Sequence, residues 1–111
     1  MTIKIKALCI SMLLILAFNI AGADDGESIF KTHGCSSCHK EKSNSKVNPS
    51  LKEISMAYQG KQEQLIKHLK GESEAIVRPE KAYLMKRHIE KTKQLSDADL
   101  KALTDYILDQ H

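Results

Sequence analysis

Apolar residues recur at intervals of three and four along most of the chain beyond its first apolar segment, which is the spacing of one face of an α-helix. A first helix is predicted from the cap Asp25 to about His33, just before Gly34. Its apolar face carries Ile29 and Phe30. No stretch alternates apolar and polar residues as a half-buried strand does, so the pattern favours an all-α fold.

The polar segment from Lys40 to Pro49 is predicted to be a surface loop. Ser50 and Glu53 follow it with the spacing of a capping box. In this arrangement the Ser50 hydroxyl and the Glu53 carboxylate satisfy free amides at the start of a helix. This second helix is expected to end near Tyr58.

Three further helices are predicted towards the C-terminus. One covers residues 62–70 and stops at Gly71. The next begins at Pro79, because a missing N–H costs nothing at the first helical position, and extends to about Ile89. After a polar stretch, Ser96 caps a last amphipathic helix.

The N-terminal segment has the composition of a secretory signal peptide. Lys4 and Lys6 precede an apolar run over residues 7–20, and the small residues Ala21 and Ala23 form a cleavage site of the A-x-A type. An uncleaved membrane anchor is the alternative, although the run is short for a spanning helix. We therefore expect export to the periplasm with cleavage after Ala23.

Cleavage would divide the chain into a signal peptide, residues 1–23, and one domain, residues 24–111. The whole chain has 111 residues and a formal charge of +3, and the segment to be removed holds two lysines and no acid. The remaining 88 residues would carry a formal charge of +1, with basic and acidic side chains interspersed. This distribution predicts neither a nucleic-acid partner nor stable membrane insertion of the cleaved protein.

The motif that indicates chemistry is Cys35-Ser36-Ser37-Cys38-His39. Two thiols three positions apart beside an imidazole suit covalent attachment of haem c, with the histidine binding iron. A zinc site would need two further ligands, and a thioredoxin-like site would need a βαβ context. The pattern therefore favours haem, with a haem-free CxxC thiol-redox module as the alternative.

Around this motif the chain resembles the class I cytochromes c, in particular their compact bacterial monohaem members. The elements that carry the resemblance are Gly26 and Phe30 ahead of CSSCH, Asn48-Pro49 with Leu51 after it, a late methionine, and Leu103 with Tyr106 in the last helix. The resemblance implies four to five helices wrapped around one covalently attached haem c per chain. It also implies that the first and last helices cross, with Gly26 and Phe30 packed against Leu103 and Tyr106.

The same resemblance implies the iron ligands. His39 would bind iron on one side and Met85 on the other, while the Pro49 carbonyl accepts a hydrogen bond from the histidine. Met56 is interpreted as a core residue. His88 lies one helical turn after Met85 and remains an alternative ligand.

Two positions depart from the usual family pattern. Many members have proline directly after the ligand methionine, where this chain has Lys86. The family usually has glycine before the proline of the loop, where this chain has Asn48, a residue that tolerates left-handed backbone.

These features predict a soluble periplasmic electron carrier, not an enzyme, whose iron cycles between Fe(III) and Fe(II). Its partners would be respiratory donor and acceptor proteins, and a monomer is expected. Lys31, Lys40 and Lys42 lie near the attachment motif and could steer acidic partners. A second hypothesis keeps the haem but leaves the distal site open or weakly held, as in a gas sensor or a peroxidase-like protein.

Overall fold

The computed structural model describes residues 25–110, so the predicted cleavage site after Ala23 lies outside the described residues. This part of the chain contains five α-helices and two 3-10 helices and no strand, which confirms the all-α prediction. The elements are α2 (Gly26–Thr32), η1 (Cys35–Ser37), α3 (Leu51–Ala57), α4 (Gln62–Leu69), η2 (Pro79–Met85), α5 (Lys86–Thr92) and α6 (Asp97–Leu108).

Three helices begin at the predicted caps. The side chains of Asp25, Ser50 and Ser96 each accept a hydrogen bond of 3.1 Å from a backbone N–H two or three residues further on. These bonds satisfy amides that have no partner inside the helix. The predicted starts of α2, α3 and α6 are therefore confirmed.

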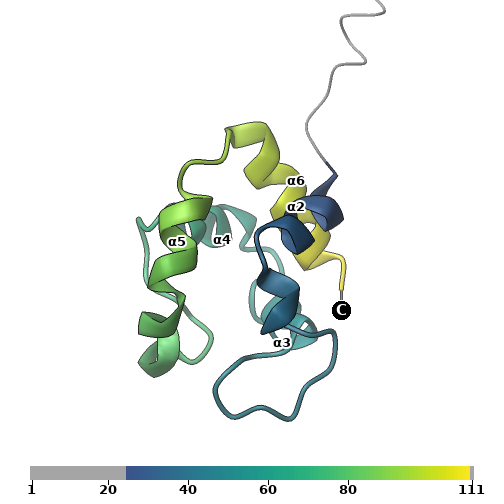
Figure 1. Cartoon of the computed structure of the whole chain (residues 1–111), viewed down its shortest axis with the longest axis vertical. Coiled ribbons are helices and arrows are strands. Elements are labelled where there is room, and N and C mark those ends of the chain that lie inside the picture. Colours follow the sequence, from purple (N-terminus) through teal and green to yellow (C-terminus); the bar gives the residue numbers. More distant parts are fainter. Residues whose placement is uncertain (1–24, 111) are drawn as a thin grey trace, which may run out of the picture.

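The first and last helices cross, as expected (Figure 1). Their backbones approach most closely at Gly26, where a Cβ atom would overlap the carbonyl group of Ala102 and lie 2.8 Å from the Cβ of Tyr106. One turn further on, the rings of Phe30 and Tyr106 pack with centroids 5.4 Å apart and an interplanar angle of 57°. Only glycine permits this approach of the two backbones.

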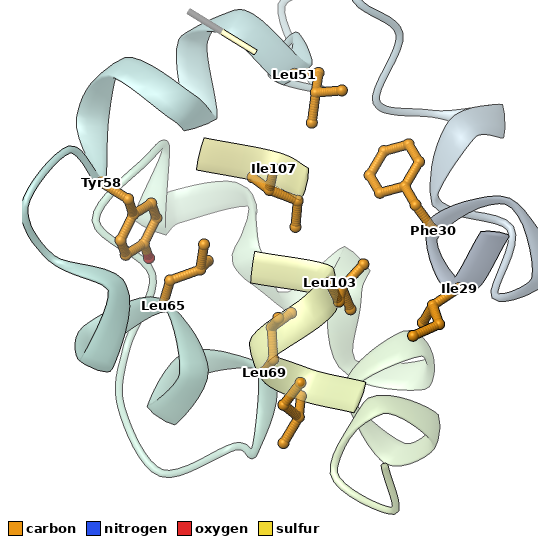
Figure 2. Packing of buried hydrophobic residues seen from close by; sticks show 9 residues of the cluster. Ile29, Phe30, Leu51, Tyr58, Leu65, Leu69, Leu103 and Ile107 are labelled. Carbon is orange, nitrogen blue, oxygen red and sulfur yellow. The ribbon is translucent and has the colours of Figure 1, made fainter. Parts of the chain in front are cut away.

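The hydrophobic core forms around α6. Leu100, Leu103 and Ile107 of this helix are all buried. In Figure 2, α6 lies between two groups of core side chains, Ile29 and Phe30 of α2 on one side and Tyr58 and Leu65 on the other. Helix α6 is therefore the element against which α2, α3 and α4 pack.

Two buried hydroxyl groups tie helices together through carbonyl oxygens. Ser55 of α3 donates to the Leu108 carbonyl oxygen at 2.9 Å, and Thr92 of α5 donates to the Leu69 carbonyl oxygen at 2.6 Å. Both carbonyls lie at helix ends, where no intrahelical N–H is available. The two bonds attach α3 to the end of α6 and α5 to the end of α4.

The segment predicted as one helix over residues 79–89 is divided in the structure. Pro79–Met85 form the 3-10 helix η2, and α5 then continues to Thr92. The apolar residues that indicated a single amphipathic helix do not share a face, since Tyr83 is 70% exposed. The predicted helix type and its end at Ile89 were wrong, whereas its start at Pro79 was right.

The interpretation of Met56 as a core residue was also wrong, because its side chain is 60% exposed. The buried face of α3 is formed by Leu51 and Ser55, with Tyr58 just after the helix. These residues are spaced by three and four positions, and Met56 falls outside that face.

Replacement of Gly26 by alanine tests the helix crossing. The added Cβ meets backbone atoms of α6 that cannot move without separating the helices, so Gly26→Ala should lower the free energy of unfolding by about 2–3 kcal/mol. Denaturant unfolding of the purified protein measures this change. Gly60→Ala is the control: its φ of 70° disfavours alanine, but open space surrounds it, and a loss of about 1 kcal/mol is expected. An equal loss in both variants would contradict the close-approach argument.

Candidate haem site

A mostly apolar cavity of about 310 Å³ lies between the helices and is lined from nearly every element of the described chain. Phe30 of α2 and Leu103 and Ile107 of α6 contribute core side chains to its wall. The cysteine motif and the loop before α3 form a second part of the wall, and η2 with α5 forms a third. Its size falls in the range of small-molecule and cofactor sites.

His39 is the buried polar residue of this cavity, with only 8% of its surface exposed. Its Nδ1 lies 2.9 Å from the Pro49 carbonyl oxygen. Because a carbonyl only accepts, Nδ1 must donate, and the neutral ring then carries its lone pair on Nε2. Burial lowers the pKa of His39, opposed by the hydrogen bond to Pro49, so the neutral form is favoured.

Met85 is brought directly opposite this nitrogen. It is the last residue of η2, and its Sδ lies 3.5 Å from His39 Nε2. The two residues are 46 positions apart in the sequence, so the tertiary fold and not one helix or turn brings them together. An imidazole lone pair and a thioether thus face each other inside an apolar cavity.

Cys35 and Cys38 lie beside this pair, at η1 and directly after it, and both line the cavity as free thiols. Gly34 takes a left-handed conformation with a φ of 73°, which turns the chain from α2 into the motif. The His39 N–H then donates to the Cys35 carbonyl oxygen at 2.8 Å, so the turn holds both thiols and the imidazole at one wall.

Burial raises the pKa of the Cys35 thiol. Redox-active dithiols depend on a lowered cysteine pKa, because the thiolate is the reactive form. Burial therefore does not activate the Cys35 thiol in the way that the haem-free thiol-redox alternative would need.

His88 lines the same cavity, as the alternative ligand would have to. Its Nδ1 is buried without a hydrogen-bond partner. A buried nitrogen of this kind costs free energy unless some group in the cavity satisfies it. Met85 ends η2 and His88 lies in α5, so the two residues do not belong to one α-helix as expected, yet both line the same cavity.

The residues present fit a haem. The cavity combines two free thiols, an imidazole with its lone pair directed inwards, an opposing thioether and one unsatisfied nitrogen, in a wall that is otherwise mostly apolar. They do not fit a metal ion held by side chains alone, since residues 25–110 contain no group of three or more His, Cys, Asp or Glu that could hold one. Within the same residues, no helix is both long and apolar enough to span a membrane.

A family model described as cytochrome c matches residues 23–110. The chain belongs to the cytochrome c family. Members of this family bind haem c covalently, typically one per monohaem domain, so the protein is a haem-binding electron-transfer protein with redox proteins as its general class of partner. A comparison with curated proteins gives no match.

Arg78 also lines the cavity of this cytochrome, and no pattern in the sequence indicated a role for it. Its guanidinium bonds the Ser45 carbonyl oxygen and pairs with the Glu53 carboxylate. In the predicted capping box, the Ser50 hydroxyl accepts from the Glu53 N–H, whereas the Glu53 carboxylate pairs with Arg78. Asn48 does not have the left-handed backbone that its position in the loop suggested. Among the described residues other than glycine, Arg78 has a positive φ instead. No local pattern marks these contacts, because they join segments 25 to 33 positions apart.

Cysteine variants test the covalent attachment. The protein purified from its natural compartment should show, by mass spectrometry under denaturing conditions, the mass of polypeptide plus one haem, because thioether bonds survive unfolding. The double variant Cys35→Ser/Cys38→Ser should show the polypeptide mass alone. Ser37→Ala, inside the same motif, should keep the haem. Retention of the haem mass in the double variant would contradict both attachment residues.

Proposed function

We propose that this protein is an exported monohaem electron carrier, with His39 and Met85 as the two axial iron ligands and Cys35 and Cys38 as the attachment residues. The observation that carries the proposal is the 3.5 Å approach of His39 Nε2 and Met85 Sδ inside the cavity, next to the two thiols. When bound, the haem supplies an iron that accepts and releases one electron.

The chain's own residues would keep both ligands in place during that change. The hydrogen bond from His39 Nδ1 to the Pro49 carbonyl fixes the ring orientation and raises the basicity of Nε2. The Met85 thioether, a soft ligand, favours the ferrous state and raises the reduction potential. The wall around these ligand positions is mostly apolar.

Docking of redox partners would depend on local charge, because the domain left after cleavage is nearly neutral. Lys40 and Lys42 are exposed on the loop that follows the motif. Lys31 is already paired with Glu27 at 3.0 Å. Steering of acidic partners is therefore assigned to Lys40 and Lys42 more than to Lys31.

Export and cleavage can be tested independently of the haem. Mass spectrometry of periplasmic protein should give a chain that begins at Asp24, because the small residues Ala21 and Ala23 satisfy the signal peptidase. Ala23→Phe should block cleavage at this bond and leave a longer chain. An N-terminus elsewhere in the unaltered protein, or retention of the whole segment, would contradict the assignment.

Replacement of Met85 tests the distal ligand. Met85→Ala should abolish the long-wavelength ferric absorption band by which methionine ligation is recognised in the family. It should also lower the reduction potential by on the order of 0.1 V or more, because axial ligands set haem potentials over roughly 0.8 V. Optical redox titration of the purified holoprotein measures both changes.

Two matched variants complete this experiment. Met56→Ala removes the exposed methionine and should leave spectrum and potential unchanged. His88→Ala should retain the ferric methionine band. Loss of the band in His88→Ala but not in Met85→Ala would contradict the assignment of Met85. A five-coordinate spectrum in the unaltered protein would support the alternative of an open distal site.

A further inference from the structure

Arg78 has the only positive φ among the described residues other than glycine, with φ 45° and ψ 59°. This left-handed backbone conformation is unfavourable for arginine, whose side chain does not stabilise it locally. It persists only where other contacts hold the residue in place. The residue stands at the start of η2, and its carbonyl accepts from the Lys81 N–H at 2.9 Å. The strained residue thus begins the segment that ends at Met85.

The Arg78 side chain makes two strong contacts on a different part of the chain. Its Nη1 donates to the Ser45 carbonyl oxygen at 2.6 Å, and its Nη2 lies 3.0 Å from a Glu53 carboxylate oxygen. The Arg78 side chain is 25% exposed and the Glu53 side chain is 43% exposed, so this ion pair is partly screened by water. A guanidinium presents rigid parallel donors and can hold both groups at once. We call this set of contacts the Arg78 clasp.

The Arg78 clasp contacts the loop before α3, which also contains the hydrogen-bond partner of His39. Ser45 Oγ accepts from the Val47 and Asn48 N–H groups at 3.2 and 3.0 Å, and these bonds stabilise the turn around Ser45. The next residue, Pro49, accepts the hydrogen bond of the His39 ring. The clasp therefore connects the loop on the His39 side of the cavity to the segment on the Met85 side.

The Met85 segment has few other attachments. Helix η2 packs chiefly against α5, which directly continues it. None of the ion pairs observed within residues 25–110 involves a residue of η2 itself. A segment with few contacts to the core helices opens locally at a lower free-energy cost than those helices do.

We propose that Arg78 is a positioning residue, whose clasp holds η2 closed over the cavity so that Met85 stays opposite His39. This inference rests on the proposed function, in which Met85 is the distal ligand. Arg78 itself touches no reacting atom. Its loss would raise the fraction of molecules in which Met85 has left its position while the rest of the fold persists.

Exogenous imidazole measures that fraction in the ferric holoprotein. It can occupy the distal position only when Met85 has left, so its apparent dissociation constant is inversely proportional to the open fraction. Arg78→Gln should bind imidazole at least tenfold more tightly than the unaltered protein, equivalent to about 1.4 kcal/mol. The ferric methionine band should disappear at correspondingly lower imidazole concentration.

Four further variants separate local opening from general destabilisation. Lys70→Gln removes another cation that joins two helical regions, at 3.2 Å from Asp97, and should change the imidazole affinity less than twofold. Glu53→Gln weakens the clasp without altering the Arg78 backbone and should give a smaller increase in affinity. Combined with Arg78→Gln, it should add little, because both changes disrupt one set of contacts. Arg78→Lys should restore part of the closure.

Wild-type imidazole affinity in both Arg78→Gln and Glu53→Gln would overturn the clasp, and so would an equal increase in Lys70→Gln. Failure of the proposed function gives a different result: the unaltered ferric protein would then lack the methionine band before any imidazole is added. That outcome would remove the ligand on which the clasp is proposed to act.

Discussion

The close approach of α2 and α6 at Gly26 is the constraint on which the rest of the structure depends. It brings Phe30 onto Tyr106 and sets the direction in which the chain leaves α2. Because the cysteine motif follows α2 after only one left-handed glycine, the crossing also determines where the two thiols and His39 lie relative to α6. The position of the cysteine motif therefore depends on a helix contact that includes none of the two thiols, His39 and Met85.

The core and the cavity are built from the same side chains. Phe30, Leu103 and Ile107 belong to the buried cluster and also line the cavity wall. A chain this short buries a modest share of its surface, and its described core has no tryptophan and few aromatic rings. Haem, which the family binds covalently, would add a large apolar surface against the core side chains that line the cavity.

The two sides of the site are held by different kinds of interaction. On the His39 side the contacts are short in sequence: a turn within the motif and a hydrogen bond to Pro49, ten residues away. On the Met85 side the segment is a 3-10 helix that packs chiefly against α5, and Arg78 at its start contacts Ser45, 33 residues away. The His39 side is thus held mainly by contacts between nearby positions of the chain, whereas the Met85 side depends on long-range contacts.

This difference explains what could be predicted from the sequence. The caps Asp25, Ser50 and Ser96, the stop at Gly34 and the CSSCH motif are local signals, since each depends on residues within a few positions. They were enough to predict an all-α fold and the family, which the structure and the family comparison bear out. The division of residues 79–92 into η2 and α5, the exposure of Met56, and the pairing of Glu53 with Arg78 were not predictable in this way. Each of these features depends on which segment, distant in the sequence, packs against the helix concerned. The spacing of apolar residues within one helix does not show which other segments it will contact.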